Sequence, residues 1–82
     1  MEIPEIQTRL QSVFDKVFLD TVTITPELSA EQVEEWDSLL HISLIAFVEK
    51  EYQIRFRMGE VEGTKNIGEF MKLIQSHLSR SH

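Results

Sequence analysis

The sequence contains no cysteine, only two prolines and three glycines, and a single tryptophan. Without cysteine, neither a disulfide framework nor a thiolate zinc site can form, and we expect no metal site. No apolar run approaches the length that crosses a bilayer, and the acidic start of the chain lacks the basic and apolar parts of a signal peptide. These absences predict a cytoplasmic protein that does not enter a membrane.

Basic residues are also scarce. Eight lysines and arginines stand against fourteen acidic residues, so the formal net charge is -6. Because an acidic surface repels phosphates, nucleic acid is not an expected partner. Residues 26–51 hold seven of the acids and one lysine, and the whole net charge lies there. This charge either steers a basic partner surface or only keeps a solvated loop soluble, and charge alone does not decide between the two.

The length of 82 residues is enough for one domain, residues 1–82, near the small end of what folds alone. So short a chain cannot enclose a deep cavity together with a full catalytic apparatus, and we do not expect an enzyme. We expect a monomer. The compact ends of the chain, with Met1 just before the first predicted helix, favour a free-standing protein.

Helical periodicity dominates the chain. Apolar residues recur every three or four positions near the N-terminus, which predicts a first helix over residues 4–19. The N-cap residue Asp37 begins a second helix that ends near Tyr52. A last helix is predicted from Asn66, where Glu69 supplies the return half of a capping box.

Two connecting segments complete the predicted fold. Residues 20–36 are expected to form a long loop, with one short helical turn over residues 29–32. A short third helix is expected between Met58 and Gly63. The fold class is therefore predicted to be all-α, a four-helix bundle.

The second predicted helix is apolar on several sides. At 100° per residue its expected core stripe contains Ile42, Ile45, Val48 and Tyr52, with Leu44 beside them. Other flanks carry Leu39, Leu40, Ala46 and Phe47. A helix that is apolar on so many sides is either buried or partly used for binding.

Ser38 lies where the acidic loop becomes the N-terminus of this helix. Free backbone N–H groups and the helix dipole favour an anion there, so a phosphodiester on Ser38 would be well placed. Local physics alone favours a plainer interpretation, in which Asp37 is only a cap and Ser38 only a polar first-turn residue.

The triplet Asp37-Ser38-Leu39, the apolar run from Ile42 to Phe56 and the closing helix resemble the acyl carrier protein family, over almost the whole chain. The resemblance implies that 4'-phosphopantetheine is esterified to Ser38, with Asp37 and Leu39 completing the cofactor-binding motif. The thiol of this arm would hold acyl or aminoacyl groups as thioesters. The implied partners are a phosphopantetheinyl transferase, an acyl-loading ligase or transferase, and downstream synthase enzymes.

The sequence departs from fatty-acid carriers around this motif. Trp36 stands near a position where many of them have a glycine, and Leu40 stands where an acid is common. Tryptophan before the motif and His41 after it resemble carriers of specialised biosynthetic pathways. We expect the outer flank of the second helix to dock partners. Its predicted docking residues are Leu40, Ser43, Ala46, Glu49 and Lys50.

Other interpretations remain open. The chain is alternatively a small acidic helical interaction module without a prosthetic group, and only the carrier requires a modifiable Ser38. Trp36 is expected to anchor the loop, and His41 to be half-buried and hydrogen-bonded. A hydrolase built on Ser38 and His41 is disfavoured, since no third group is positioned to orient the imidazole and no oxyanion site is evident.

Overall fold

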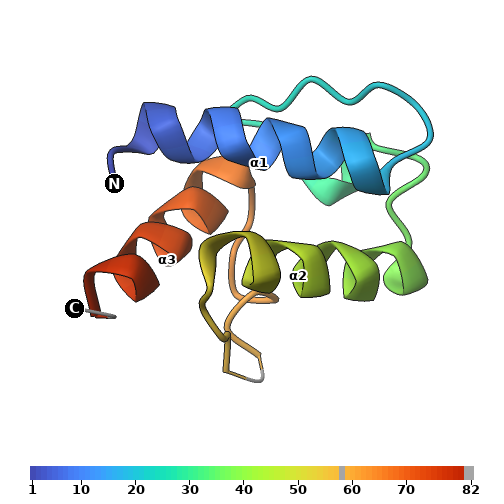
Figure 1. The fold of residues 1–82 in the computed structure, drawn as a ribbon. Helices are drawn as coiled ribbons and strands as arrows, with labels where there is room; N and C mark the ends of the chain where they lie inside the picture. Colours follow the sequence, from blue (N-terminus) through green and yellow to red (C-terminus); the bar gives the residue numbers. More distant parts are fainter. Residues whose placement is uncertain (58, 81–82) are drawn as a thin grey trace.

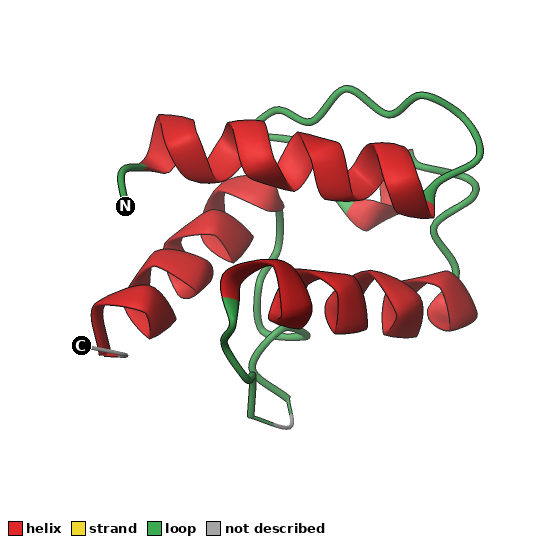
Figure 2. Ribbon diagram, viewed as in Figure 1, coloured by secondary structure: helices red, strands yellow, loops and turns green. Residues whose placement is uncertain are grey.

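Three α-helices form the fold in the computed structural model, which describes residues 1–57 and 59–80 (Figures 1 and 2). The first helix, α1 (Ile3–Val17), packs against both α2 (Ser38–Tyr52) and α3 (Ile67–Arg80). In Figure 1, α2 runs back beneath α1, and α3 descends from the middle of α1. The all-α class is confirmed, and the described residues contain no strand. None of the described helices is long and apolar enough to span a bilayer.

The buried stripe of α1 is the one that the periodicity predicts. Ile6, Leu10 and Phe14 are fully buried, and Val13 lies beside them. The helix ends two residues before the predicted Leu19. The carboxylate of Glu35 accepts the backbone N–H groups of Leu19 and Asp20, at 2.7 and 3.1 Å. These groups are therefore diverted from helical hydrogen bonds to a side chain of the following loop.

The long loop between α1 and α2 first runs back along α1 and then returns through a single 3₁₀ turn, η1 (Ala30–Gln32) (Figure 1). Gln11 of α1 binds the extended segment on both sides. Its amide nitrogen donates to the carbonyl of Val22 at 2.7 Å, and its amide oxygen accepts the N–H of Ile24 at 2.9 Å. Ile24 is buried, so this stretch is part of the core wall.

The same loop also caps α3. The first-turn N–H groups of Ile67 and Gly68 donate to the carbonyls of Leu28 and Pro26, each at 2.8 Å. A helix begins with N–H groups that lack an intrahelical partner, so this contact satisfies two of them. A β-carbon at Gly68 would lie 3.1 Å from the Pro26 carbonyl oxygen, which explains why glycine suits this close approach. The predicted start of this helix is confirmed, since Asn66 accepts the Glu69 N–H at 2.9 Å.

The core stripe of α2 differs from the prediction. Leu44, Val48 and Tyr52 are buried, and Leu40 and Ile45 are half-buried against the core. Ile42, which was expected to be a core residue, is 67% exposed. The helix is apolar on nearly every side, so periodicity does not fix which side faces α1.

The prediction of a short third helix is also wrong for the residues that the structure describes. Met58 lies outside the described residues, and residues 59–63 form successive turns. Gly59 has a φ of 85°, which a helix does not allow. Glu60 then accepts the Arg57 N–H at 2.7 Å and pairs with His77 of α3 at 2.9 Å, so this segment is fastened to α3.

The corrected stripe makes a direct prediction for two residues of α2. Leu44→Ala removes a fully buried side chain and should lower the free energy of unfolding by about 3 kcal/mol. Ile42→Ala, at an exposed position, should change it by less than about 0.5 kcal/mol. Urea denaturation of both variants measures the difference, and equal losses would contradict this placement of α2.

Tyr52 predicts how stability changes at high pH. Its hydroxyl donates to the Ile6 carbonyl at 2.8 Å, and burial raises its pKa from 10.0 to about 12, partly offset by the nearby Arg9 guanidinium. Because the folded pKa is the higher one, this stabilisation is complete below about pH 10 and lost as the pH rises through 12. Tyr52 is the single tyrosine, so tyrosinate absorbance reports it alone. A midpoint near 10 in folded protein would contradict the buried hydrogen bond.

Candidate functional site

The start of α2 presents Ser38 at the surface. Asp37 is the N-cap, as predicted, and its carboxylate accepts the Leu40 N–H at 2.8 Å. Ser38 is the first residue of the helix and is exposed. Among the described residues its hydroxyl has no hydrogen-bond partner, so the oxygen is available for esterification. The cap stabilises the helix turn that carries it.

Trp36 fixes the chain immediately before this turn. Its ring meets Phe14 and Phe18 of the core edge to face, with centroids 5.4 and 5.7 Å apart. Such aromatic contacts stabilise by roughly 0.5–1.5 kcal/mol beyond the area that they bury. The prediction that Trp36 anchors the loop is therefore confirmed. The last loop residues enter α2 from one fixed direction.

His41 completes this anchor from the helix side. The indole N–H of Trp36 donates to Nδ1 of His41 at 3.0 Å, and the two rings stack with centroids 6.1 Å apart. His41 is half-buried, as predicted. Ser38 thus lies in a turn that is held by two hydrogen bonds, from the Leu40 N–H to the Asp37 carboxylate and from the Trp36 indole N–H to His41.

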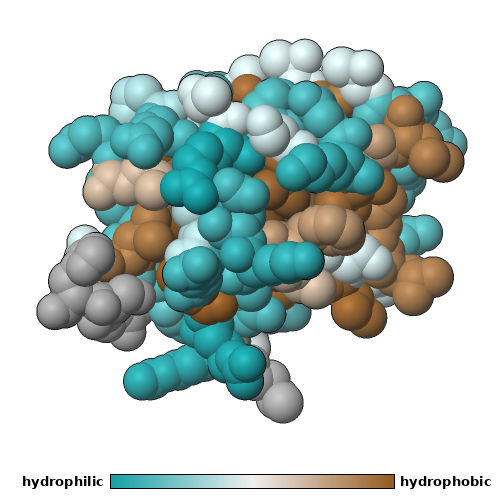
Figure 3. Space-filling view, viewed as in Figure 1, coloured by the Kyte–Doolittle hydropathy of each residue, from teal (hydrophilic) through white to brown (hydrophobic). Residues whose placement is uncertain are grey.

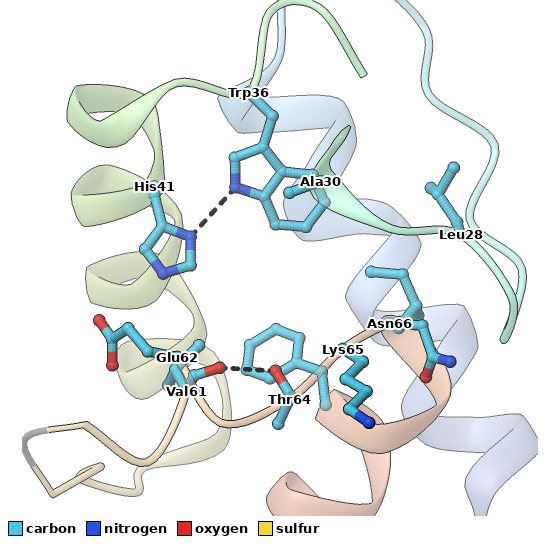
Figure 4. A pocket seen from close by; sticks show the side chains of 11 residues that line it. Leu28, Ala30, Trp36, His41, Val61, Glu62, Thr64, Lys65 and Asn66 are labelled. Carbon is cyan, nitrogen blue, oxygen red and sulfur yellow. Dashed lines mark hydrogen bonds between the residues drawn. The ribbon is translucent and has the colours of Figure 1, made fainter. Parts of the chain in front are cut away.

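A cavity of about 250 Å³ opens beside this pair, between η1, α2, the turns before α3 and the start of α3. Figure 4 shows Trp36 and His41 on one side, with Val61, Glu62 and Thr64 on the other. Further walls are formed by Leu28, Ala30, Lys65, Asn66, Ile67 and Phe70. A more open groove, which Ser38 also lines, adjoins this cavity and shares Ala30, Trp36, His41 and Glu62 with it. Sequence reasoning missed this cavity, because its walls come from four separate segments.

The outer face of α2 is apolar. Leu39 is 76% exposed, Ile42 67% and Phe47 46%. Figure 3 shows hydrophobic side chains gathered where α1 ends and α2 begins. We call Leu39, Ile42, Ala46 and Phe47 the outer face. Ile42 and Phe47 were not among the predicted docking residues, and a periodicity with the correct phase is the signal that would have found them.

The structure separates the five predicted docking residues. Ser43, Ala46 and Lys50 are exposed along α2. Leu40, which was expected to be exposed, is half-buried and packs against the core. The Glu49 carboxylate accepts the Phe56 N–H at 2.8 Å, so it holds the chain that follows α2.

Comparisons with known proteins show a likeness to a solved structure. No family model matches the sequence, and no curated protein does. A solved structure does: the solution NMR structure of a holo acyl carrier protein from Geobacter metallireducens superposes with a TM-score of 0.75. The two sequences are 34% identical, and the match covers 96% of this chain and 87% of that one.

The fold, the exposed serine at the start of α2 and this likeness define a carrier protein. The chain belongs to the acyl carrier protein family. Members of this family carry groups for other enzymes. The residues present fit a phosphopantetheine arm, because an exposed hydroxyl without a partner among the described residues stands next to the free N–H end of a helix.

The cap at Asp37 gives a stability prediction. Asp37→Ala leaves the Leu40 N–H without its acceptor and should lower the free energy of unfolding by about 1 kcal/mol. Asp37→Asn keeps an acceptor and should cost only a few tenths of that amount. The control is Glu34→Ala, which removes an exposed acid of the same loop and should leave the urea midpoint unchanged. Equal midpoints for all three variants would show that Asp37 does not cap α2.

Proposed function

We propose that Ser38 is the attachment point for 4'-phosphopantetheine and that the chain holds acyl or aminoacyl groups as thioesters on this arm. The bound arm supplies a thiol that forms the thioester. The observation that carries the proposal is the position of Ser38, which is exposed, first in α2 and free of a hydrogen bond among the described residues. The holo state of the Geobacter protein supports the same cofactor here.

The residues around Ser38 have distinct roles in this proposal. Asp37 fixes the first turn of α2, so the attachment point does not move when partners exchange. Leu39 completes the motif and is exposed beside the serine, where a phosphopantetheinyl transferase must approach. The chain itself carries out no catalysis, and partner enzymes perform every chemical step.

The outer face of α2 is the proposed docking surface for the acyl-loading ligase or transferase and for the downstream synthase enzymes. Its exposed apolar side chains supply contact area next to the arm. Ser43 and Lys50 lie among them. The small side chain of Ala46 lets a partner approach the helix closely. The half-buried Leu40 and Glu49 contribute by holding α2 in place.

Acidic residues of the loop supply the long-range attraction. Glu31, Glu34 and Asp37 are exposed close to the start of α2 in the chain, whereas Glu51 pairs with Arg9 at 2.9 Å. A basic partner surface is therefore steered toward the end of α2 that carries Ser38. Charge steering makes the encounter with a partner fast, and the apolar contact then holds the complex. This combination suits a carrier that binds several enzymes in turn.

The proposal extends to a specialised biosynthetic pathway. Its support is that a tryptophan precedes the motif, a histidine follows it, and the docking helix is apolar where acids are common in fatty-acid carriers. The second candidate, an interaction module without a prosthetic group, uses the same outer face but needs no free hydroxyl on Ser38.

The test is modification by coenzyme A and a broad-specificity phosphopantetheinyl transferase, followed by intact mass. Wild-type protein should gain one phosphopantetheine. Ser38→Ala should keep the wild-type melting temperature and gain none. The matched control is Ser12→Ala, which removes an exposed serine of α1 and should be modified like wild type. Modification of Ser38→Ala, or none of the folded wild-type protein, would refute the carrier assignment.

A further inference from the structure

We infer that His41, held in one tautomer by Trp36, selects a short acyl group that carries a hydroxyl or keto oxygen on its chain. The inference rests on the proposed function, because the acyl group must be attached through the arm on Ser38. The inference is based on the hydrogen bond between the Trp36 and His41 rings. Both rings line the cavity and the groove beside Ser38.

The indole N–H of Trp36 can only donate, so Nδ1 of His41 must accept. A neutral imidazole that accepts at Nδ1 carries its proton on Nε2. Among the described residues, Nε2 has no hydrogen-bond partner. The pair therefore presents one N–H donor, at a fixed position, to whatever enters between Trp36 and Glu62 (Figure 4).

The other side-chain N–H groups of the wall belong to Lys65 and Asn66, which lie across the cavity from His41 (Figure 4). Much of its wall is apolar, with Leu28, Val61, Ile67 and Phe70 among its residues. The Thr64 hydroxyl donates to the Val61 carbonyl at 2.6 Å, so that it faces the cavity only as an acceptor. Lys65 lies on the far side, and its ammonium points away from the imidazole (Figure 4).

The volume limits the length of the group. A cavity of about 150 Å³ accommodates benzene, so one of 250 Å³ has room for roughly ten non-hydrogen atoms. A short acyl chain fits together with the end of the arm, whereas a long fatty chain does not.

The selection follows from the cost of an unpaired donor. A plain alkyl chain that covers Nε2 removes its water and gives nothing in return, whereas a hydroxyl or keto oxygen pairs with it. A site with a polar group of this kind discriminates more strongly than an apolar pocket, which separates chains only by size. His41 is thus a specificity-determining residue, and Trp36 is a positioning residue that acts through it.

The test loads wild-type protein with butyryl and with 3-hydroxybutyryl groups, using the corresponding coenzyme A thioesters and the same transferase. The readout is the rate of thioester cleavage by hydroxylamine, divided by the rate for the same acyl group on coenzyme A. A group inside the cavity is protected. We expect 3-hydroxybutyryl to be protected about fivefold more than butyryl, the effect of one net hydrogen bond.

Variants separate the roles of the two rings. His41→Phe keeps a ring but has no donor, and the fivefold difference should disappear. His41→Gln restores an N–H donor and should recover part of it. Trp36→Phe should reduce the difference, and the nitrogen NMR shifts of His41 should then report a mixture of tautomers in place of one. Ser12→Ala, an exposed site on α1 away from the cavity, is the control and should behave as wild type.

Equal protection of the two acyl groups in wild-type protein, or a difference that persists in His41→Phe, would overturn the inference. Both results require that Ser38 has accepted the acylated arm, so they leave the carrier function intact. Failure of the loading step itself is instead the failure of the proposed function, and intact mass detects it before any cleavage is measured.

Discussion

The packing of α2 against α1 determines where the other parts of the molecule lie. Leu44, Val48 and Tyr52 bury one side of α2, and the Tyr52 hydroxyl is tied to the Ile6 carbonyl of α1 at 2.8 Å. With this side fixed, Ser38 is exposed at the first turn, and the outer face is turned to solvent. The imidazole of His41 is turned toward the loop, where Trp36 meets it. One helix thus carries the proposed attachment point, the proposed docking surface and part of the cavity wall.

The sequence predicts most of this arrangement where polar residues mark the boundaries. The Asp37 cap and the Asn66 start of α3 were found because capping residues act locally, and the stripe of α1 because polar residues interrupt it. The side of α2 that faces the core could not be found, since few polar residues mark its surface and Ile42 fits a core position as well as Leu44 does. Tertiary contacts with α1 choose between them.

The remaining errors share a physical cause, which is contact between segments that are distant in the chain. Gly59 and Gly63 enclose a run that looks helical, yet the Glu60–His77 pair fastens it to α3 as successive turns. The walls of the cavity come from η1, α2, the turns and α3, so no local sequence pattern predicts the cavity. Trp36 and His41 were recognised as an anchor and a half-buried residue, but only the structure joins them in one hydrogen bond beside Ser38.

In the proposed function, the exposed hydroxyl at the first turn of α2 carries the prosthetic group in the cell. Fragmentation mass spectrometry of the intact protein, purified from the organism that makes it, detects this group and locates it in the chain. We expect a phosphopantetheine mass on fragments that contain Ser38 and on no fragment that lacks it. The same mass on another residue, or unmodified protein while other carriers of the same cells are modified, would contradict it.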